Sequence, residues 1–203
     1  MRRFGIGAFA LILLLQIPSA LAGTVLIVGD SISAGFGLNA AQGWVTLLQE
    51  RLKKHDPAFD VVNASISGDT SAGGLARLPG LLDRHQPRVV VIELGGNDGL
   101  RGQPPAQLKQ NLTAMTEAAK SAGAKVLILG MQLPPNYGQR YTRTFAQTFT
   151  EVSAEQNVAI VPFMLDGVGA VEGMMQPDGI HPNAAAQPRL LENVWPELVP
   201  LLK

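Results

Sequence analysis

Short apolar runs alternate with longer amphipathic segments along most of this chain. Most of these runs are continuously apolar and rich in β-branched residues, as strands buried on both faces of a parallel sheet are, while a shorter one carries only Val61 and Val62. We predict strands at Val25–Val28, Asp60–Asn63, Val89–Leu94, Val126–Leu129 and Val158–Val161.

The segments between these runs place apolar residues at helical spacing. Helices are predicted at Gly43–Lys53, around Leu75–Leu82, at Pro105–Ser121, at about Tyr141–Gln156 and at about Ala185–Leu202. Strands that alternate with helices indicate right-handed βαβ units. The predicted fold is therefore a three-layer α/β/α sandwich with about five parallel strands.

The first 22 residues have the pattern of a secretory signal peptide. Arg2 and Arg3 precede the apolar stretch Phe4–Ile17, and Ala20-Leu21-Ala22 fits a small-x-small cleavage site. The apolar stretch is shorter than the ~20 residues that a spanning helix needs, which disfavours an uncleaved anchor. We predict cleavage after Ala22, one domain over residues 23–203, and a periplasmic or secreted protein without stable membrane insertion.

Composition excludes several kinds of chemistry. The 203 residues contain no cysteine, which removes disulfides, thiolate catalysis and cysteine-based zinc sites. Sixteen basic residues balance sixteen acidic ones without a long charge run, so nucleic-acid binding has little support. We see no heptad pattern or evident interface and expect a monomer.

Glycine and small polar residues gather where the first three predicted strands end. The ends carry Gly29-Asp30-Ser31, then Asn63 followed by Gly68, then Gly95-Gly96-Asn97. Parallel strands bring their carboxyl ends to one edge of the sheet, where open α/β sheets bind ligands. These three segments are therefore expected to share one crevice.

Ser31 is a candidate nucleophile, and a serine hydroxyl needs a neighbouring base. Of the three histidines, His55 and His85 lie at polar helix ends, where they fit as C-terminal caps. His181 follows Asp178 by three residues in a turn-rich loop, so the aspartate could hold its Nδ1 proton while Nε2 faces the serine. Taken alone, the same loop also fits an Asp-Gly turn before a helix.

Acyl transfer also requires donors for the oxyanion that forms on the carbonyl oxygen. The amides of Ser31 and Gly68 and the side chain of Asn97 are suited to this, although Gly68 and Asn97 each fit an ordinary turn or loop as well. The G-x-S-x-G pattern of a sharp nucleophile elbow is absent, because the last position is Ser33. We therefore expect Ser31 to open a loop rather than a strand-to-helix turn.

Together these segments resemble a known family. Gly29-Asp30-Ser31, Gly68, Gly95-Gly96-Asn97-Asp98 and Asp178-Gly179-Ile180-His181-Pro182 are similar, in order and spacing, to the four blocks of the SGNH (GDSL-type) hydrolases. The chain looks most like the bacterial periplasmic branch that includes thioesterase I/lysophospholipase L1 and arylesterases.

The resemblance implies a flavodoxin-like α/β/α fold without a metal or other cofactor. It implies a Ser31–His181–Asp178 triad and an oxyanion hole formed by Ser31, Gly68 and Asn97. The implied reaction is hydrolysis of acyl or aryl esters, and of acyl thioesters or lysophospholipids, through an acyl-enzyme. Two alternatives stay open: a carbohydrate acetylesterase of the same fold, and a non-catalytic lipid- or carbohydrate-binding module.

The substrate-binding residues are less clearly indicated. Met131–Gly138 follows the fourth strand and should border the crevice, with Leu133, Pro134 and Tyr137 as an apolar wall. The resemblance suggests a loop that contacts an acyl chain, whereas a Pro-rich connection without such contact fits equally well. The apolar segment Met164–Met175 can either line the site or pack beneath a long loop.

Three further aspartates are interpreted as structural. Asp30, Asp69 and Asp98 are expected to accept hydrogen bonds from loop amides around the crevice. Arg77 and Arg101 are expected to pair with these carboxylates.

Overall fold

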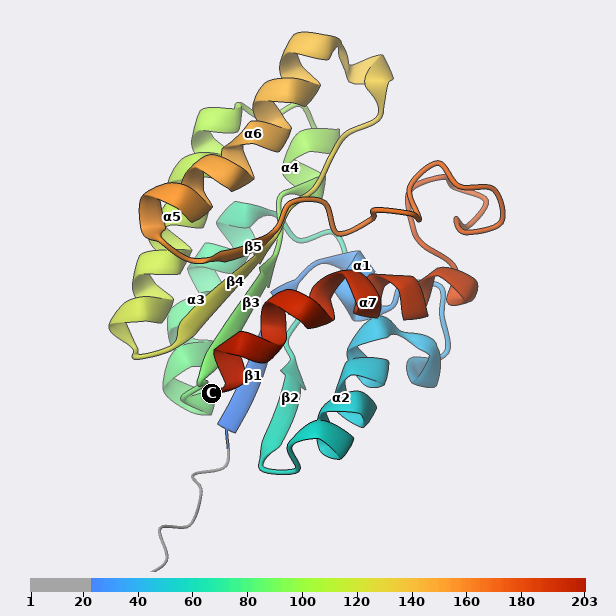
Figure 1. The fold of residues 1–203 in the computed structure, drawn as a ribbon. Coiled ribbons are helices and arrows are strands. Elements are labelled where there is room, and N and C mark those ends of the chain that lie inside the picture. Colours follow the sequence, from blue (N-terminus) through green and yellow to red (C-terminus); the bar gives the residue numbers. More distant parts are fainter. Residues whose placement is uncertain (1–22) are drawn as a thin grey trace, which may run out of the picture.

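The computed structural model describes residues 23–203, which form a central sheet with helices on both faces (Figure 1). The signal peptide predicted at residues 1–22 lies outside the described residues. The strands are all parallel and lie in the order β2-β1-β3-β4-β5. They span Gly23–Gly29 (β1), Phe59–Asn63 (β2), Val89–Glu93 (β3), Lys125–Leu129 (β4) and Ala159–Val161 (β5).

The longer helices form the two outer layers. Helices α2 (Trp44–His55) and α7 (Gln187–Leu198) pack together on one face of the sheet. The other face is covered by α3 (Ser71–His85), α5 (Pro105–Ser121) and α6 (Gln139–Gln156). The predicted three-layer α/β/α sandwich is confirmed.

Short helical segments lie in the connections. They comprise α1 (Ser31–Ala34), α4 (Gly96–Leu100) and the 3-10 turns η1 (Ala40–Gln42), η2 (Pro135–Tyr137), η3 (Ala184–Ala186) and η4 (Val199–Leu202). The predicted last helix is thus divided into η3, α7 and η4. Pro188 lies in the first turn of α7, where its missing N–H is tolerated, whereas Pro196 lies inside the helix, two residues before its end.

Ser31 does not open a loop, so that expectation was wrong. It is the first residue of α1, which follows β1 after a single residue. Asp30 caps this helix by accepting a hydrogen bond from the Ile32 amide, and Gly35 ends it with a left-handed backbone at φ 73°. The cap and the glycine stop explain why a G-x-S-x-G pattern is not needed for a tight turn here.

The core consists mainly of the two central strands and the helix faces that cover them. Val25–Val28 and Val89–Ile92 are completely buried. Burial of each such side chain stabilises the fold by roughly 1.5–3 kcal/mol. Trp44 is completely buried in the core, whereas Trp195 is only partly buried and its ring contacts Arg51 and His55.

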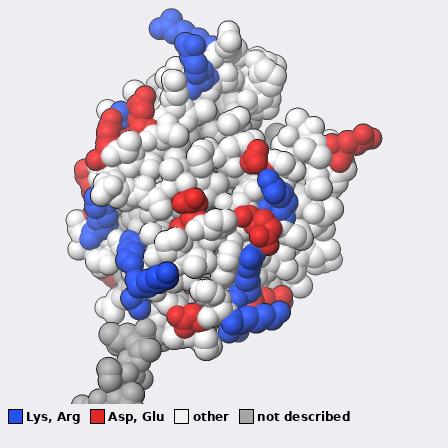
Figure 2. Space-filling view, in the orientation of Figure 1, with Lys and Arg blue, Asp and Glu red and all other residues white. Residues whose placement is uncertain are grey.

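Charged side chains are scattered over the surface shown in Figure 2, with basic and acidic groups interspersed. This face therefore offers no extended area of one sign. None of the helices within residues 23–203 has the length and apolar character needed to cross a membrane.

Candidate active site

The structure brings Ser31, His181 and Asp178 together above the carboxyl end of β1. The Ser31 Oγ lies 2.8 Å from His181 Nε2, although the two residues are 150 positions apart. His181 Nδ1 lies 2.6 Å from Asp178 Oδ2. Because a carboxylate can only accept, Nδ1 carries the proton and Nε2 is free to accept from the serine hydroxyl. The arrangement can therefore withdraw a proton from Ser31 as its oxygen attacks an electrophile.

The loop that holds His181 is organised by Asp178. Its Oδ1 accepts hydrogen bonds from the backbone amides of Ile180 and His181, at 2.9 and 3.0 Å. The hydrogen bond to the His181 ring, together with these two amides, lowers the pKa of Asp178 to about 2. The carboxylate thus stays ionised at any pH at which the protein would normally work.

Asn97 lies beside the nucleophile turn at the start of α4. Its Nδ2 donates a 3.0 Å hydrogen bond to Asp30 Oδ2, which fixes the direction of the amide. A side-chain amide has two N–H groups, so one remains for a substrate oxygen. Asp30 is almost completely buried, and this burial raises its pKa to about 6 despite the hydrogen bonds from Ile32 and Asn97.

Gly68 lies in a turn that is tied to the same strand ends. Its φ of 80° is a left-handed conformation that favours glycine. The Ile66 amide donates to Gly29 O, and the Arg77 guanidinium joins Asp69, Ala64 O and Gly29 O. The turn is thereby held against the end of β1.

The arginine predictions have different outcomes. Arg77 forms an ion pair with Asp69 at 2.8 Å, as expected. Arg101 does not pair with an aspartate; it donates to Gly68 O at 3.0 Å, because it ends α4 directly opposite that turn. It therefore connects the Gly68 turn to the helix that carries Asn97.

The three aspartates accept hydrogen bonds from backbone amides around the crevice as expected, although the amides of Ile32 and Ser71 belong to helix starts and not to loops. Asp30 accepts from Ile32 N, Asp69 from Thr70 N and Asp98 from Ser71 N. Asp98 also accepts from the Ser71 hydroxyl, and both residues are buried. This pair fixes α4 against the start of α3.

An apolar cavity of about 480 Å³ borders this constellation. Its wall includes Ile32, Gly96 and Ile180, the chain neighbours of Ser31, Asn97 and His181. Leu133 and Pro134 line it too, and the remaining apolar side chains of the wall are Leu100, Met131, Pro135, Phe163, Leu165, Ala170 and Met175. A volume and lining of this kind suit an apolar ligand.

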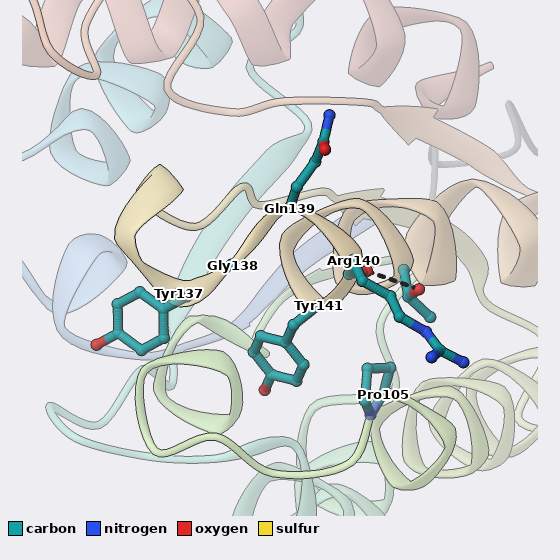
Figure 3. A pocket seen from close by; sticks show the side chains of 7 residues that line it. Pro105, Tyr137, Gly138, Gln139, Arg140 and Tyr141 are labelled. Carbon is teal, nitrogen blue, oxygen red and sulfur yellow. Dashed lines mark hydrogen bonds between the residues drawn. The ribbon is translucent and has the colours of Figure 1, made fainter.

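Tyr137 does not line this cavity. It borders a separate, open hollow of about 580 Å³ between η2, α5 and the start of α6 (Figure 3). Its hydroxyl donates to Leu100 O, and that of Tyr141 donates to Gln103 O. The two tyrosines therefore connect the segment around η2 to the end of α4.

The apolar segment Met164–Met175 serves both purposes considered for it. Met164 and Val168 are completely buried in the core. Leu165 and Met175 instead form part of the cavity wall, while Val171 is exposed.

One residue near the site was missed by sequence reasoning. Glu93 was assigned simply to a strand, but its buried carboxyl lies directly beneath the Ser31 turn. A single acidic residue at the end of an otherwise apolar, fully buried strand is the signal that could have revealed it. Within residues 23–203, no group of three or more histidine, aspartate or glutamate side chains is arranged to hold a metal ion.

A parallel α/β/α sandwich with a Ser–His–Asp arrangement at the carboxyl edge of its sheet is the architecture of a serine hydrolase. Residues 27–188 match the model of the GDSL-like lipase/acylhydrolase family. The chain belongs to this family, and it is a hydrolase of carboxylic esters.

Several characterised proteins are similar over almost the full length. The chain is 64% identical to "Esterase TesA" of Pseudomonas aeruginosa, covering 97% of this chain and 96% of that protein. It is 45% identical to "Thioesterase 1/protease 1/lysophospholipase L1" of Escherichia coli K12, covering 96% and 92%. A crystal structure of TesA, 65% identical in sequence, matches with a TM-score of 0.86 over 88% of this chain and 99% of that one.

Proposed function

We propose that the protein hydrolyses acyl esters and acyl thioesters through an acyl-enzyme formed on Ser31, with His181 as general base and Asp178 as its orienting carboxylate. The observation that carries this proposal is the continuous hydrogen-bond chain from Ser31 Oγ through His181 to Asp178. A serine that only capped a helix would have no need of an oriented imidazole.

The acylation step follows from this chain. As Ser31 Oγ attacks the acyl carbon, its proton passes to His181 Nε2, and Asp178 stabilises the resulting imidazolium. The Ser31 and Gly68 amides and Asn97 Nδ2 are the donors for the oxyanion. When the tetrahedral intermediate collapses, the bond to the leaving group breaks and Nε2 returns the proton to the departing alkoxide or thiolate.

Deacylation repeats these roles with water as the nucleophile. His181 takes a proton from the water as it attacks the ester carbon on Ser31. Collapse then releases the carboxylic acid and restores the Ser31 hydroxyl. The partial exposure of the His181 side chain, 17%, leaves a route for that water.

The apolar cavity supports a substrate with a fatty-acyl chain. It begins beside Ser31 at Ile32 and is lined mainly by aliphatic and methionine side chains. The names of the relatives, esterase and thioesterase/lysophospholipase, agree with such substrates. The predicted signal peptide favours a periplasmic or secreted location, and the protein is expected to act as a monomer.

The test compares wild type, Ser31→Ala and the control Ser121→Ala on p-nitrophenyl esters with acyl chains of two to twelve carbons. Ser121 ends α5 and is exposed. Ser31→Ala should abolish turnover while keeping the wild-type circular dichroism spectrum, and Ser121→Ala should behave as wild type. Normal activity of Ser31→Ala would refute the mechanism.

The chain-length profile of the wild type distinguishes the substrate classes. An optimum at medium or long acyl chains supports the proposal, whereas a sharp optimum at acetyl would favour a carbohydrate acetylesterase. Leu133→Ala should reduce kcat/KM for long chains more than for acetyl. Arg140→Ala, in the separate hollow of Figure 3, should leave the profile unchanged.

A further inference from the structure

Glu93 ends β3 with a carboxyl group that has no part in the proton transfers described above. Its side chain is completely buried at the centre of the sheet. Placing a carboxyl group in such surroundings is unfavourable unless hydrogen bonds compensate for the lost water. Its contacts therefore indicate what the residue does.

One oxygen of Glu93 accepts every hydrogen bond that this carboxyl receives. Oε2 lies 3.3 Å from Asp30 N, 3.2 Å from Ser33 N and 2.7 Å from Ser33 Oγ. These donors lie on both sides of Ser31 in the chain. The carboxyl thus holds the turn at its two ends, with the nucleophile between them.

Gly29 provides the space that lets the Glu93 carboxyl group come close to the Ser31 turn. A Cβ atom on residue 29 would lie 2.7 Å from Glu93 Oε2 and 2.8 Å from Ser33 Cβ. A larger residue at this position would therefore push the carboxyl away from the turn. The glycine before Asp30 and Ser31 is explained by the space that Glu93 and Ser33 require.

The contacts continue from Ser33 to the loop that carries His181. Trp44 Nε1 donates to Ser33 Oγ at 3.3 Å, and Trp44 N donates to Gln187 Oε1 at 3.0 Å. Gln187 Nε2 in turn donates to the carbonyls of Pro182 and Asn183, just after His181. Trp44, Ser33 and Gln187 are all buried, so water does not compete for these bonds.

We propose that Glu93 is a positioning residue for the reaction, which fixes the Ser31 turn directly, the Asn97 amide through Asp30, and the His181 loop through Ser33, Trp44 and Gln187. The inference rests on the proposed function, because it assigns Glu93 a role in aligning that nucleophile, base and oxyanion donor. Misplacement of reacting groups by about 1 Å can reduce a rate by ~100-fold.

The electrostatic surroundings of Glu93 agree with its role as a hydrogen-bond acceptor. Burial, together with the neighbouring Asp30 carboxylate, raises the pKa of Glu93 well above its ordinary value. The neutral acid still offers an oxygen that can accept. A glutamine has the same shape and a similar acceptor, so Glu93→Gln should preserve the contacts to Asp30 and Ser33.

The test compares wild type, Glu93→Gln, Glu93→Leu and Ser33→Ala by steady-state kinetics on one p-nitrophenyl ester. Glu93→Leu should lower kcat by ~100-fold and Ser33→Ala by ~10-fold, with KM within about twofold of wild type, because alignment changes and not the acyl cavity. Glu93→Gln should retain kcat within about threefold. The control is Thr116→Val, which alters an equally buried polar side chain in α5 and should leave kcat unchanged.

Hydrogen–deuterium exchange gives a readout that does not depend on turnover. The amides of Asp30 and Ser33 should exchange slowly in wild type and Glu93→Gln and faster in Glu93→Leu. Where Glu93→Leu does not fold, Ser33→Ala decides the question by the same exchange and by its kcat. Unchanged kcat and exchange in Ser33→Ala, or equal loss of kcat in Glu93→Gln and Glu93→Leu, would overturn the positioning role.

The two levels of the proposal can fail separately. Wild-type protein that folds but has no esterase activity refutes the proposed function. The exchange rates then still show whether Glu93 holds the turn.

Discussion

Asp178 and Asp30 both serve Ser31, one through His181 and the other as its chain neighbour, but their surroundings are opposite. The Asp178 side chain is 38% exposed, and its hydrogen bonds lower its pKa to about 2. Asp30 is only 2% exposed, and burial raises its pKa to about 6. The first is held in its charged form at little cost in desolvation. Asp30 lies where a negative charge is unfavourable, and the same buried position gives it rigid hydrogen bonds to Ile32 and Asn97.

The comparison separates two tasks that carboxyl groups perform here. A carboxylate that orients an imidazole must remain ionised while the imidazole gains charge. A carboxyl that fixes backbone amides and an asparagine can tolerate partial protonation, because it still accepts hydrogen bonds. The carboxyl groups of Asp30 and Glu93 belong to the second kind.

The largest effect is expected at the exposed member of the pair. Asp178→Asn should lower kcat by about 10³–10⁴-fold, because an amide at this position favours the wrong tautomer of His181. The fold should be unaffected, since the residue lies in a surface loop. Steady-state kinetics with circular dichroism measures both, and a kcat close to wild type would show that His181 does not depend on this carboxylate.

Asn97 tests the contact that Asp30 makes with the oxyanion site. Asn97→Ala removes one proposed donor and should lower kcat by about 10²–10³-fold with little change in KM. The separate measurement of kcat and KM distinguishes this from a loss of substrate binding. An effect confined to KM would contradict the assignment of Asn97 to the oxyanion hole.

Asp30 itself should affect stability with a characteristic pH dependence. Because its folded-state pKa is raised, its favourable contribution is complete below its ordinary value of 3.8 and is lost as the pH rises through about 6. Asp30→Asn has only one oxygen for the N–H donors of Ile32 and Asn97, so it should lower the melting temperature at about pH 4. At about pH 7 the loss should be smaller by about 3 kcal/mol, or reversed, because only the wild type then carries the unfavourable buried charge. An equal difference between the two proteins at both pH values would show that the buried charge is not unfavourable.

The smallest effect is expected for an exposed acid that neither orients His181 nor fixes the amides around Ser31. Asp166 forms a surface ion pair with Arg189 at 3.2 Å, in the same long connection that leads to His181. Asp166→Ala should change the free energy of unfolding by less than about 0.5 kcal/mol and leave kcat unchanged. A large loss of activity in this variant would mean that the whole connection, and not Asp178 in particular, supports the site.

Features that are written in a short stretch of sequence could be predicted. The strand ends were predicted because an unbroken apolar run followed by glycine marks the end of a buried strand. His181 and Asp178 were found because turn residues surround them and their spacing is local. The predicted helix at Pro105–Ser121 agrees with α5 at both ends, where Pro105 lies in the first turn and Gly123 follows the last.

The residues that were missed depend on contacts between distant parts of the chain. Trp44 and Gln187 are 143 positions apart, and only packing of α2 against α7 brings them together. Glu93 stands out as the one acid of a buried apolar strand, but its role could not be predicted because its donors lie at the end of a different strand. Tyr137 was predicted to face the crevice, but the turn at η2 directs it to Leu100 O and the other hollow.

The central claim is that Ser31 forms the acyl-enzyme. Labelling of the wild type with a fluorophosphonate, followed by mass spectrometry of its peptides, tests this most directly. We predict a single adduct on Ser31, formed slowly in His181→Ala and absent in Ser31→Ala. An adduct on another residue, or no adduct while ester hydrolysis continues, would contradict the account.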